Sequence, residues 1–140
     1  MLAVEAVMRA YARRFGADEE AWAVAGLLHD FDYERFPDQH PESGARILGE
    51  RGWSQELQRA VLSHAEHTGV ARESLMEKAL AASDDVTGLM VAAALVQPTR
   101  DLRLVKLSSV RKKWKDRSFA GGVDRDAAAR AAEAIGVPLE

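Results

Sequence analysis

Apolar residues recur every three to four positions through most of the chain, which is the spacing of amphipathic α-helices. Within residues 2–15, Val4, Tyr11 and Phe15 fall on one face, and Gly16 follows as a helix-ending residue. Comparable patterns predict further helices over residues 18–31, 43–50, 54–68, 73–96 and 124–135. Four of these segments begin at a residue that can cap a helix, namely Asp18, Ser43, Ser54 and Asp124. No segment alternates with the period of a strand. We therefore expect an all-α protein.

Two segments depart from this pattern. Residues 32–42 carry Pro37 and Pro41, each of which removes a backbone donor, so we expect a loop that forms a wall of the functional site. The longest apolar stretch, residues 86–98, is too short to span a bilayer and is interpreted as part of a buried core helix.

The composition is typical of one soluble globular domain. A length of 140 residues is enough for one domain with a core and too short for two. The chain is 47% hydrophobic and 29% charged, with a net charge of -3. The absence of cysteine excludes a disulfide framework and a zinc site with cysteine ligands. No basic segment followed by an apolar signal core opens the chain, so we expect a cytoplasmic protein without a membrane partner.

Positive charge is concentrated in one segment. Residues 100–117 hold eight basic side chains against two acidic ones, whereas residues 1–99 hold nine basic and sixteen acidic ones. Leu102, Val110 and Trp114 give the basic segment an apolar helical face. Such a helix could bind nucleic acid or form an interface, for example in a homodimer, although the net charge of -3 argues against a wholly electrostatic nucleic-acid binder.

The strongest candidate chemistry lies in residues 26–34, which read Gly-Leu-Leu-His-Asp-Phe-Asp-Tyr-Glu. His29 and Asp30 place a nitrogen and an oxygen ligand side by side at the edge of a core, a mixed pair that suits a divalent ion. In the predicted helix 18–31 both lie in the last turn, where the helix dipole favours a cation. A hydrogen-bonded core histidine followed by a helix-ending aspartate would give the same dipeptide. Other residues of the chain must therefore distinguish a metal site from this structural pair.

Two more side chains could complete a metal site. Asp84 lies in an otherwise apolar stripe of the predicted helix 73–96, where a carboxylate must be paired, coordinated or neutralised. His64 lies on an apolar line of the predicted helix 54–68, and a ligand and a satisfied core histidine are equally open there. With His29 and Asp30, these residues occupy three helices that could converge on one ion. His67 is interpreted as a surface residue.

This ordered set resembles the motif of the HD superfamily of metal-dependent phosphohydrolases, which consists of a first His, a His-Asp pair and a distant Asp. His29 and Asp30 match the pair, and Asp84, within Ala-Ser-Asp-Asp-Val-Thr-Gly-Leu, matches the distant Asp. Together with Ser-Val-Arg-Lys-Lys-Trp-Lys at residues 109–115 and Phe-Ala at 119–120, the motif resembles a small bacterial group of predicted HD hydrolases over nearly the whole chain.

The resemblance implies a compact HD-domain helical bundle. It implies a single domain over residues 1–140, with metal-site helices in 1–98 and basic C-terminal helices packed on them in 99–140. It also implies one or two divalent metal ions, with Mn, Fe, Ni, Co, Zn and Mg not distinguished. The implied ligands are His29, Asp30 and Asp84, with His40 and His64 available for a second ion.

The implied activity is hydrolysis of a phosphoester, such as a nucleotide or another small phosphorylated metabolite, by a metal-activated water, with Asp30 as a catalytic residue. Cationic side chains would stabilise the phosphoryl group, and the candidates are Lys106, Lys112 and Lys113, although lysines also simply solvate one face of an amphipathic helix. The family's first His has no counterpart, since no histidine precedes His29. We expect an upstream start that supplies it, or a member that lacks one ligand; the alternative function is a noncatalytic regulatory or nucleotide-binding module.

Overall fold

The protein folds into α-helices joined by short turns, and the computed structural model describes residues 1–137 and 139. Positions 138 and 140, which belong to the predicted segment 99–140, lie outside the described residues. The described part contains no strand, so the all-α prediction is confirmed. Its elements are α1 (Leu2–Phe15), α2 (Glu19–Leu28), η1 (Pro37–Gln39), α3 (Glu42–Glu50), α4 (Gln55–His64), η2 (Glu66–Thr68), α5 (Leu75–Leu95), η3 (Leu102–Leu104), α6 (Leu107–Lys115) and α7 (Arg125–Ala134).

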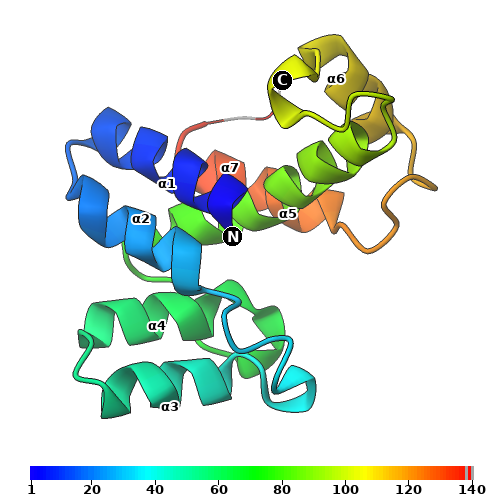
Figure 1. Cartoon of the computed structure of the whole chain (residues 1–140). Coiled ribbons are helices and arrows are strands. Elements are labelled where there is room, and N and C mark those ends of the chain that lie inside the picture. The colour runs from blue at the N-terminus through cyan, green and yellow to red at the C-terminus, as the bar shows by residue number, and fades with distance from the viewer. Residues whose placement is uncertain (138, 140) are drawn as a thin grey trace.

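The helices form two antiparallel pairs around one long helix. The pair α1 and α2 lies above the pair α3 and α4, and α5 packs against α1 and α4 with α7 along it (Figure 1). Met8, Val61 and Leu80 are fully buried where these helices meet. Gly26 permits the close approach of α2 to α1, because a Cβ atom at this position would lie 2.9 Å from the backbone N and Cα of Glu5.

The helix ends follow local capping chemistry. Gly16 ends α1 in the left-handed region with φ 64°, as the sequence predicts. The Asp18 side chain accepts from the backbone N of Glu20 and Ala21, and Ser54 accepts from the backbone N of Leu57. At α3 the sequence prediction is wrong, because the helix begins one residue earlier and Ser43 lies buried inside it instead of capping it.

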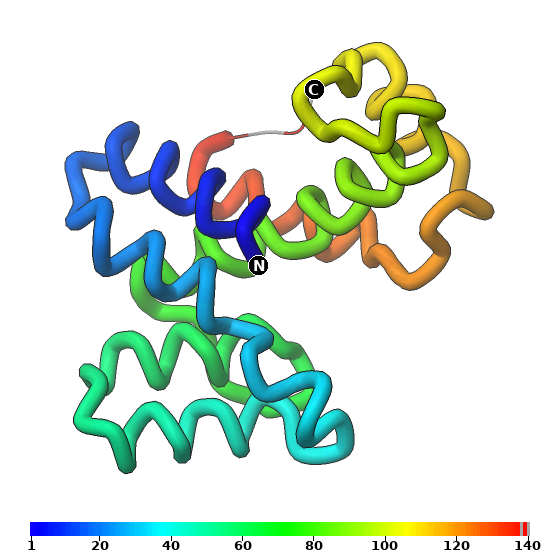
Figure 2. The backbone as a smooth tube through the Cα atoms, viewed as in Figure 1, coloured from blue at the N-terminus to red at the C-terminus, as the bar shows by residue number. Residues whose placement is uncertain are grey.

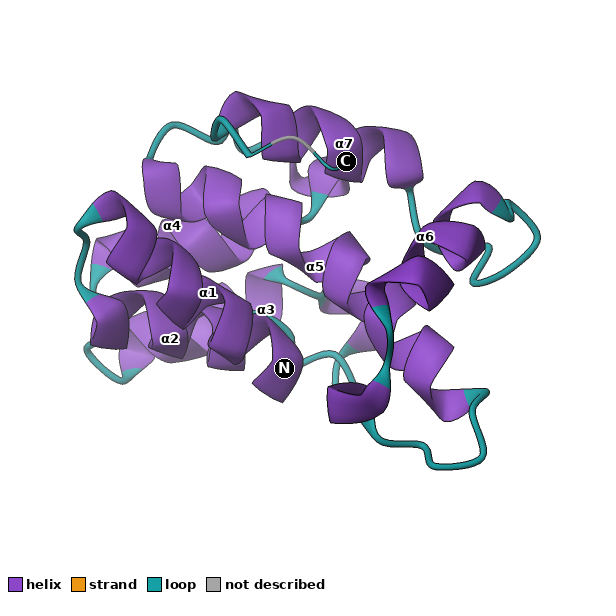
Figure 3. Ribbon diagram, turned by 90° about the horizontal axis from the view of Figure 1, so that it is seen from above, coloured by secondary structure: helices purple, strands orange, loops and turns teal. Residues whose placement is uncertain are grey.

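The C-terminal part of α5 is less buried than the sequence predicts. Leu95 and Val96 expose 58% and 61% of their surface, so residues 86–98 bury one face only. The basic helix α6 packs on this end of α5, away from the two helix pairs (Figures 2 and 3). No helix of the described residues has the length and apolar character needed to cross a membrane.

Candidate metal centre

The candidate site begins where α2 ends. The sequence predicts a helix as far as residue 31, but α2 stops at Leu28, and His29 is its C-terminal cap residue. Tight turns follow, closed by a hydrogen bond from Tyr33 N to Asp30 O and one from Phe36 N to Asp32 O. Asp30 and Asp32 therefore project from turns and not from a helix face.

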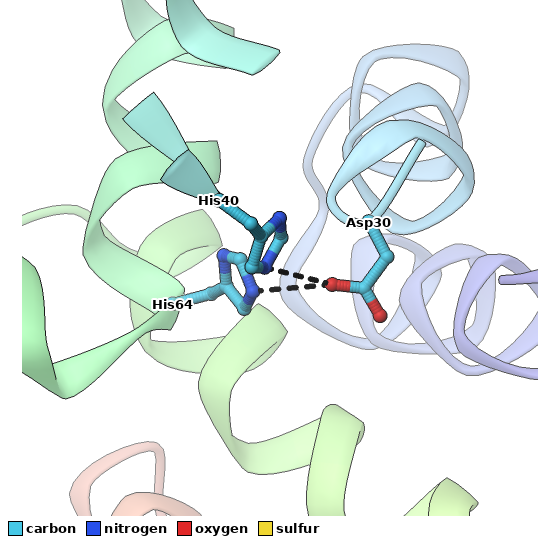
Figure 4. Close-up of side chains that lie close together, drawn as sticks. All are labelled: Asp30, His40 and His64. Carbon is cyan, nitrogen blue, oxygen red and sulfur yellow. Dashed lines mark ion pairs between the residues drawn. The ribbon is translucent and has the colours of Figure 1, made fainter. Parts of the chain in front are cut away.

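Two groups of potential metal ligands share Asp30. One contains Asp30, His40 and His64, the other contains His29, Asp30 and Asp84, and within each group the ligand atoms lie within 4.8 Å of one another. Oδ1 of Asp30 is 3.2 Å from His40 Nε2 and 3.4 Å from His64 Nε2 (Figure 4). On the other side, His29 Nε2 is 3.1 Å from Asp30 Oδ2 and 3.4 Å from Asp84 Oδ1. The structure thus brings together the five residues that the sequence singles out as ligands.

The three histidines of the site present the same nitrogen to the carboxylates. Nδ1 of His29 donates to Gly26 O at 2.9 Å, and Nδ1 of His64 donates to Val61 O at 2.5 Å. Nδ1 of His40 donates to Asp32 Oδ1 at 2.7 Å. With Nδ1 engaged as a donor, Nε2 of each imidazole faces the site and can offer a lone pair to a metal ion once it carries no proton.

The electrostatic environment of the centre favours a bound positive charge. Burial lowers the pKa of His29, but the neighbouring carboxylates of Asp30 and Asp84 outweigh burial and raise it to about 9. Burial likewise opposes ionisation of Asp30, yet the imidazoles of His29 and His64 hold the pKa of this carboxyl well below its usual range. His29 Nε2 is moreover buried without a hydrogen-bond partner among the described residues. A cation between these groups would relieve both conditions.

Asp32 orients one ligand, and the sequence reasoning missed it. Its carboxylate is completely buried; Oδ1 accepts from His40 Nδ1, and Oδ2 accepts from Gly44 N at 2.7 Å. A Cβ atom on residue 44 would lie only 2.8 Å from the carboxylate carbon of Asp32, so α3 closes directly over it. The available signal was a second carboxylate two positions after Asp30, in the loop expected to form a wall of the site.

A hollow of about 200 Å³ opens beside the centre. Arg72 lies in its wall, and its guanidinium donates to the carbonyls of Ser63 at 2.8 Å and His64 at 2.9 Å. Asp85 also lies there, and half-burial together with nearby carboxylates raises the pKa of its carboxyl. The complete lining is His64, Glu66, Arg72, Ala81, Asp84, Asp85, Asp124, Ala127 and Ala131. Sequence spacing gave no signal for the approach of Asp124 or Arg72 to the ligands.

The lysines proposed from the sequence lie elsewhere. Lys106 precedes α6 as its N-terminal cap residue, and Lys112 lines a separate hollow with Leu107 and Lys115. The Lys113 ammonium lies 4.2 Å from the centre of the Phe119 ring. None of the three lysines lines the hollow beside the ligands. His67 is exposed, as expected, and its Nε2 donates to the His40 carbonyl at 3.0 Å.

Comparison with known proteins gives one family. The model of the HD domain matches residues 1–107, which include every potential metal ligand described above. Searches of curated proteins and of solved structures gave no match. Since the match covers more than half of the chain, and HD domains bind divalent metals through histidines and aspartates, the protein belongs to the HD domain family of the metal-dependent phosphohydrolase superfamily.

Proposed function

We propose that the protein is a metal-dependent phosphohydrolase that cleaves a small phosphoester. One observation carries the proposal: three imidazoles, each fixed through Nδ1, direct Nε2 at two carboxylates. Lone pairs facing anions repel each other unless a proton or a metal cation lies between them. The donor set of three imidazole nitrogens and two carboxylates suits a divalent transition metal, so the residues fit the group that the family implies.

Within this proposal Asp30 would be a ligand in both groups, with His40 and His64 in one and with His29 and Asp84 in the other. Bound divalent ions would supply a water of lowered pKa and neutralise charge on the phosphoryl oxygens. Asp84 exposes 41% of its side chain, so it can contact an ion and still border the hollow where a substrate would enter.

Metal content and turnover test the proposal together. Protein stripped with a chelator and reloaded with Mn²⁺ should bind two equivalents by elemental analysis and hydrolyse p-nitrophenyl phosphate. Asp30→Asn should reduce metal content and turnover more than substitution of a ligand that belongs to one group only, because Asp30 belongs to both groups. Asp38→Asn, at an exposed carboxylate outside both groups, is the matched control and should behave as wild type.

The outcomes separate the readings of the site. Metal binding without hydrolysis of any phosphoester would refute the enzyme and leave an HD-type binding module. A folded protein that binds no divalent ion would refute the metal centre itself.

A further inference from the structure

The hollow beside the metal ligands has a chemical character that points to a substrate class. It starts at two of the ligands, His64 and Asp84, and extends to α7, where Ala127 and Ala131 lie in its wall. A phosphoryl group placed at the ligands would therefore direct the rest of its molecule into this hollow. The deduction that follows rests on the phosphohydrolase proposed above.

Hydrogen-bond acceptors dominate the wall. Asp124 caps α7 through Oδ1, which accepts from the backbone N of Asp126 and Ala127, and Asp85 Oδ1 accepts from Asp124 N at 3.3 Å. The second oxygen of each carboxylate has no hydrogen-bond partner among the described residues. Glu66 adds a third carboxylate, 4.0 Å from the guanidinium of Arg72. Such a wall suits a group that donates hydrogen bonds.

The cation in the wall lies next to a ligand. Arg72 is held by the carbonyls of Ser63 and His64, so its position is fixed relative to the His64 imidazole. A guanidinium in this place can contact a phosphoryl oxygen, since planar donors pair well with phosphate. Positive charge at Arg72 therefore lies beside His64, and the carboxylates of Asp85, Asp124 and Glu66 line the same hollow.

Size and composition disfavour nucleotides and bisphosphates. A volume of about 200 Å³ is below the range of roughly 300–1,000 Å³ for pockets that enclose larger organic ligands. No phenyl, phenol or indole ring lines the described hollow, so a nucleobase would find none of these stacking partners. A second phosphate would meet the carboxylates of Asp85, Asp124 and Glu66, and repulsion between like charges would weaken its binding.

We propose that the hollow binds the leaving group of a phosphomonoester of a small alcohol that carries further hydroxyl or ammonium groups. Hydrolysis would form a bond from the water oxygen to phosphorus and break the bond from phosphorus to the alcohol oxygen. One proton of the water ends on the alcohol oxygen, which gives the free alcohol and inorganic phosphate. Arg72 is the phosphate contact, and Asp85, Asp124 and Glu66 are the specificity residues.

Binding can be followed without turnover through the alanine methyl groups of the hollow. Full-length protein with ¹³C-methyl alanine and Mg²⁺ is titrated with glycerol 3-phosphate, phosphoethanolamine, AMP and fructose 1,6-bisphosphate. The methyl signals of Ala81, Ala127 and Ala131 should shift on binding. The dissociation constants obtained from these shifts should be at least tenfold lower for the first two ligands than for the last two. A larger affinity for glycerol 3-phosphate than for phosphoethanolamine assigns the donor as hydroxyl, and the reverse order assigns it as ammonium.

Kinetics with Mn²⁺ and three variants test the same wall. Glu66→Gln, Asp85→Asn and Asp124→Ser, the last of which keeps a helix cap, should each lower kcat/KM for the preferred substrate about tenfold, the effect of losing one hydrogen bond to a charged group. The three variants should also reduce the ratio of kcat/KM for the preferred substrate to kcat/KM for fructose 1,6-bisphosphate. Glu133→Gln, exposed on α7 and outside the hollow, should leave both substrates unchanged.

Failure of this proposal and failure of the phosphohydrolase give different results. Hydrolysis that prefers AMP, or ligands that bind without shifting the three methyl signals, overturns the substrate class and leaves the hydrolase intact. Methyl shifts with the predicted ligand order but no turnover with any ester support the hollow as a binding site and refute the enzyme.

Discussion

Replacing Gly44 by alanine sets two physical effects of opposite sign against each other. Gly44 lies inside α3, and in an unobstructed helix interior alanine is favoured over glycine by about 1 kcal/mol. At this position, however, the new Cβ would lie 2.8, 2.9 and 3.0 Å from Cγ, Oδ1 and Oδ2 of Asp32. The whole buried carboxylate must move, because ordinary carbon contacts begin several tenths of an ångström further away.

The cost follows from what Asp32 holds. Its two hydrogen bonds, to His40 Nδ1 and to Gly44 N, are both 2.7 Å long, and bonds to a charged group contribute about 1.5–3 kcal/mol each. Weakening both should outweigh the helix preference, so we expect Gly44→Ala to lower the free energy of unfolding by about 1–4 kcal/mol. Loss of an orienting partner should also weaken metal binding at the group of Asp30, His40 and His64 by about 10–100-fold.

Two other helical glycines provide the controls. A Cβ on Gly88 of α5 would meet nothing within 4 Å, so Gly88→Ala should stabilise the protein by about 0.5–1 kcal/mol. A Cβ on Gly49 of α3 would lie 2.8 Å from the end of the flexible Gln58 side chain, which can swing away. Urea unfolding followed by circular dichroism, and calorimetric titration with Mn²⁺, give the two readouts. If Gly44→Ala resembles Gly88→Ala in both, the role assigned to Asp32 is wrong.

Three further results are expected. Gly26→Ala should prevent stable packing of α1 on α2, with a Tm below that of Gly49→Ala, because its Cβ would meet the Glu5 backbone at 2.9 Å, which cannot swing aside. In metal-free protein, His29 should titrate near pH 9 by NMR, and bound Mg²⁺ should abolish this titration. Since this pKa lies above the ordinary 6.5, the stability that protonated His29 contributes is complete below pH 6.5 and is lost as the pH rises through 9. Arg125→Lys should destabilise the chain by about 2 kcal/mol or more, because one ammonium cannot satisfy the five carbonyls that this guanidinium contacts, and amide exchange should accelerate first over residues 113–123.

Local chemistry explains how much of the fold the sequence predicted. The caps at Asp18, Ser54 and Asp124 and the left-handed turn at Gly16 depend on groups within three or four residues, so they can be recognised without the rest of the chain. The potential metal ligands could be predicted from residue type, because a carboxylate in an apolar stripe or a His-Asp pair at a helix end favours a partner, although Asp84 exposes 41% of its side chain in the structure.

Tertiary contacts explain what the sequence could not predict. The apolar pattern continues to Phe31, yet α2 ends at Leu28, because Asp32 must turn inward to accept from Gly44 N and His40. Arg72 approaches the ligands only because the carbonyls at the end of α4 accept from it. The basic charge of residues 100–117 suggested phosphate contacts, but charge along a sequence does not show which end of α5 it will face.

The site concentrates negative charge that a metal ion would offset. His29 Nε2 is buried and lies 3.1 Å from Asp30 Oδ2 and 3.4 Å from Asp84 Oδ1, so a neutral His29 would turn its lone pair toward two carboxylates. The carboxylates of Asp30 and Asp84 share this small volume, and only protonation of His29 offsets their charge when no cation is bound. Because these groups come from the ends of α2 and α4 and from the middle of α5, a bound divalent ion would link three helices that the chain brings together only on folding. Metal binding should therefore raise the Tm, and the ion would be a structural part of the domain.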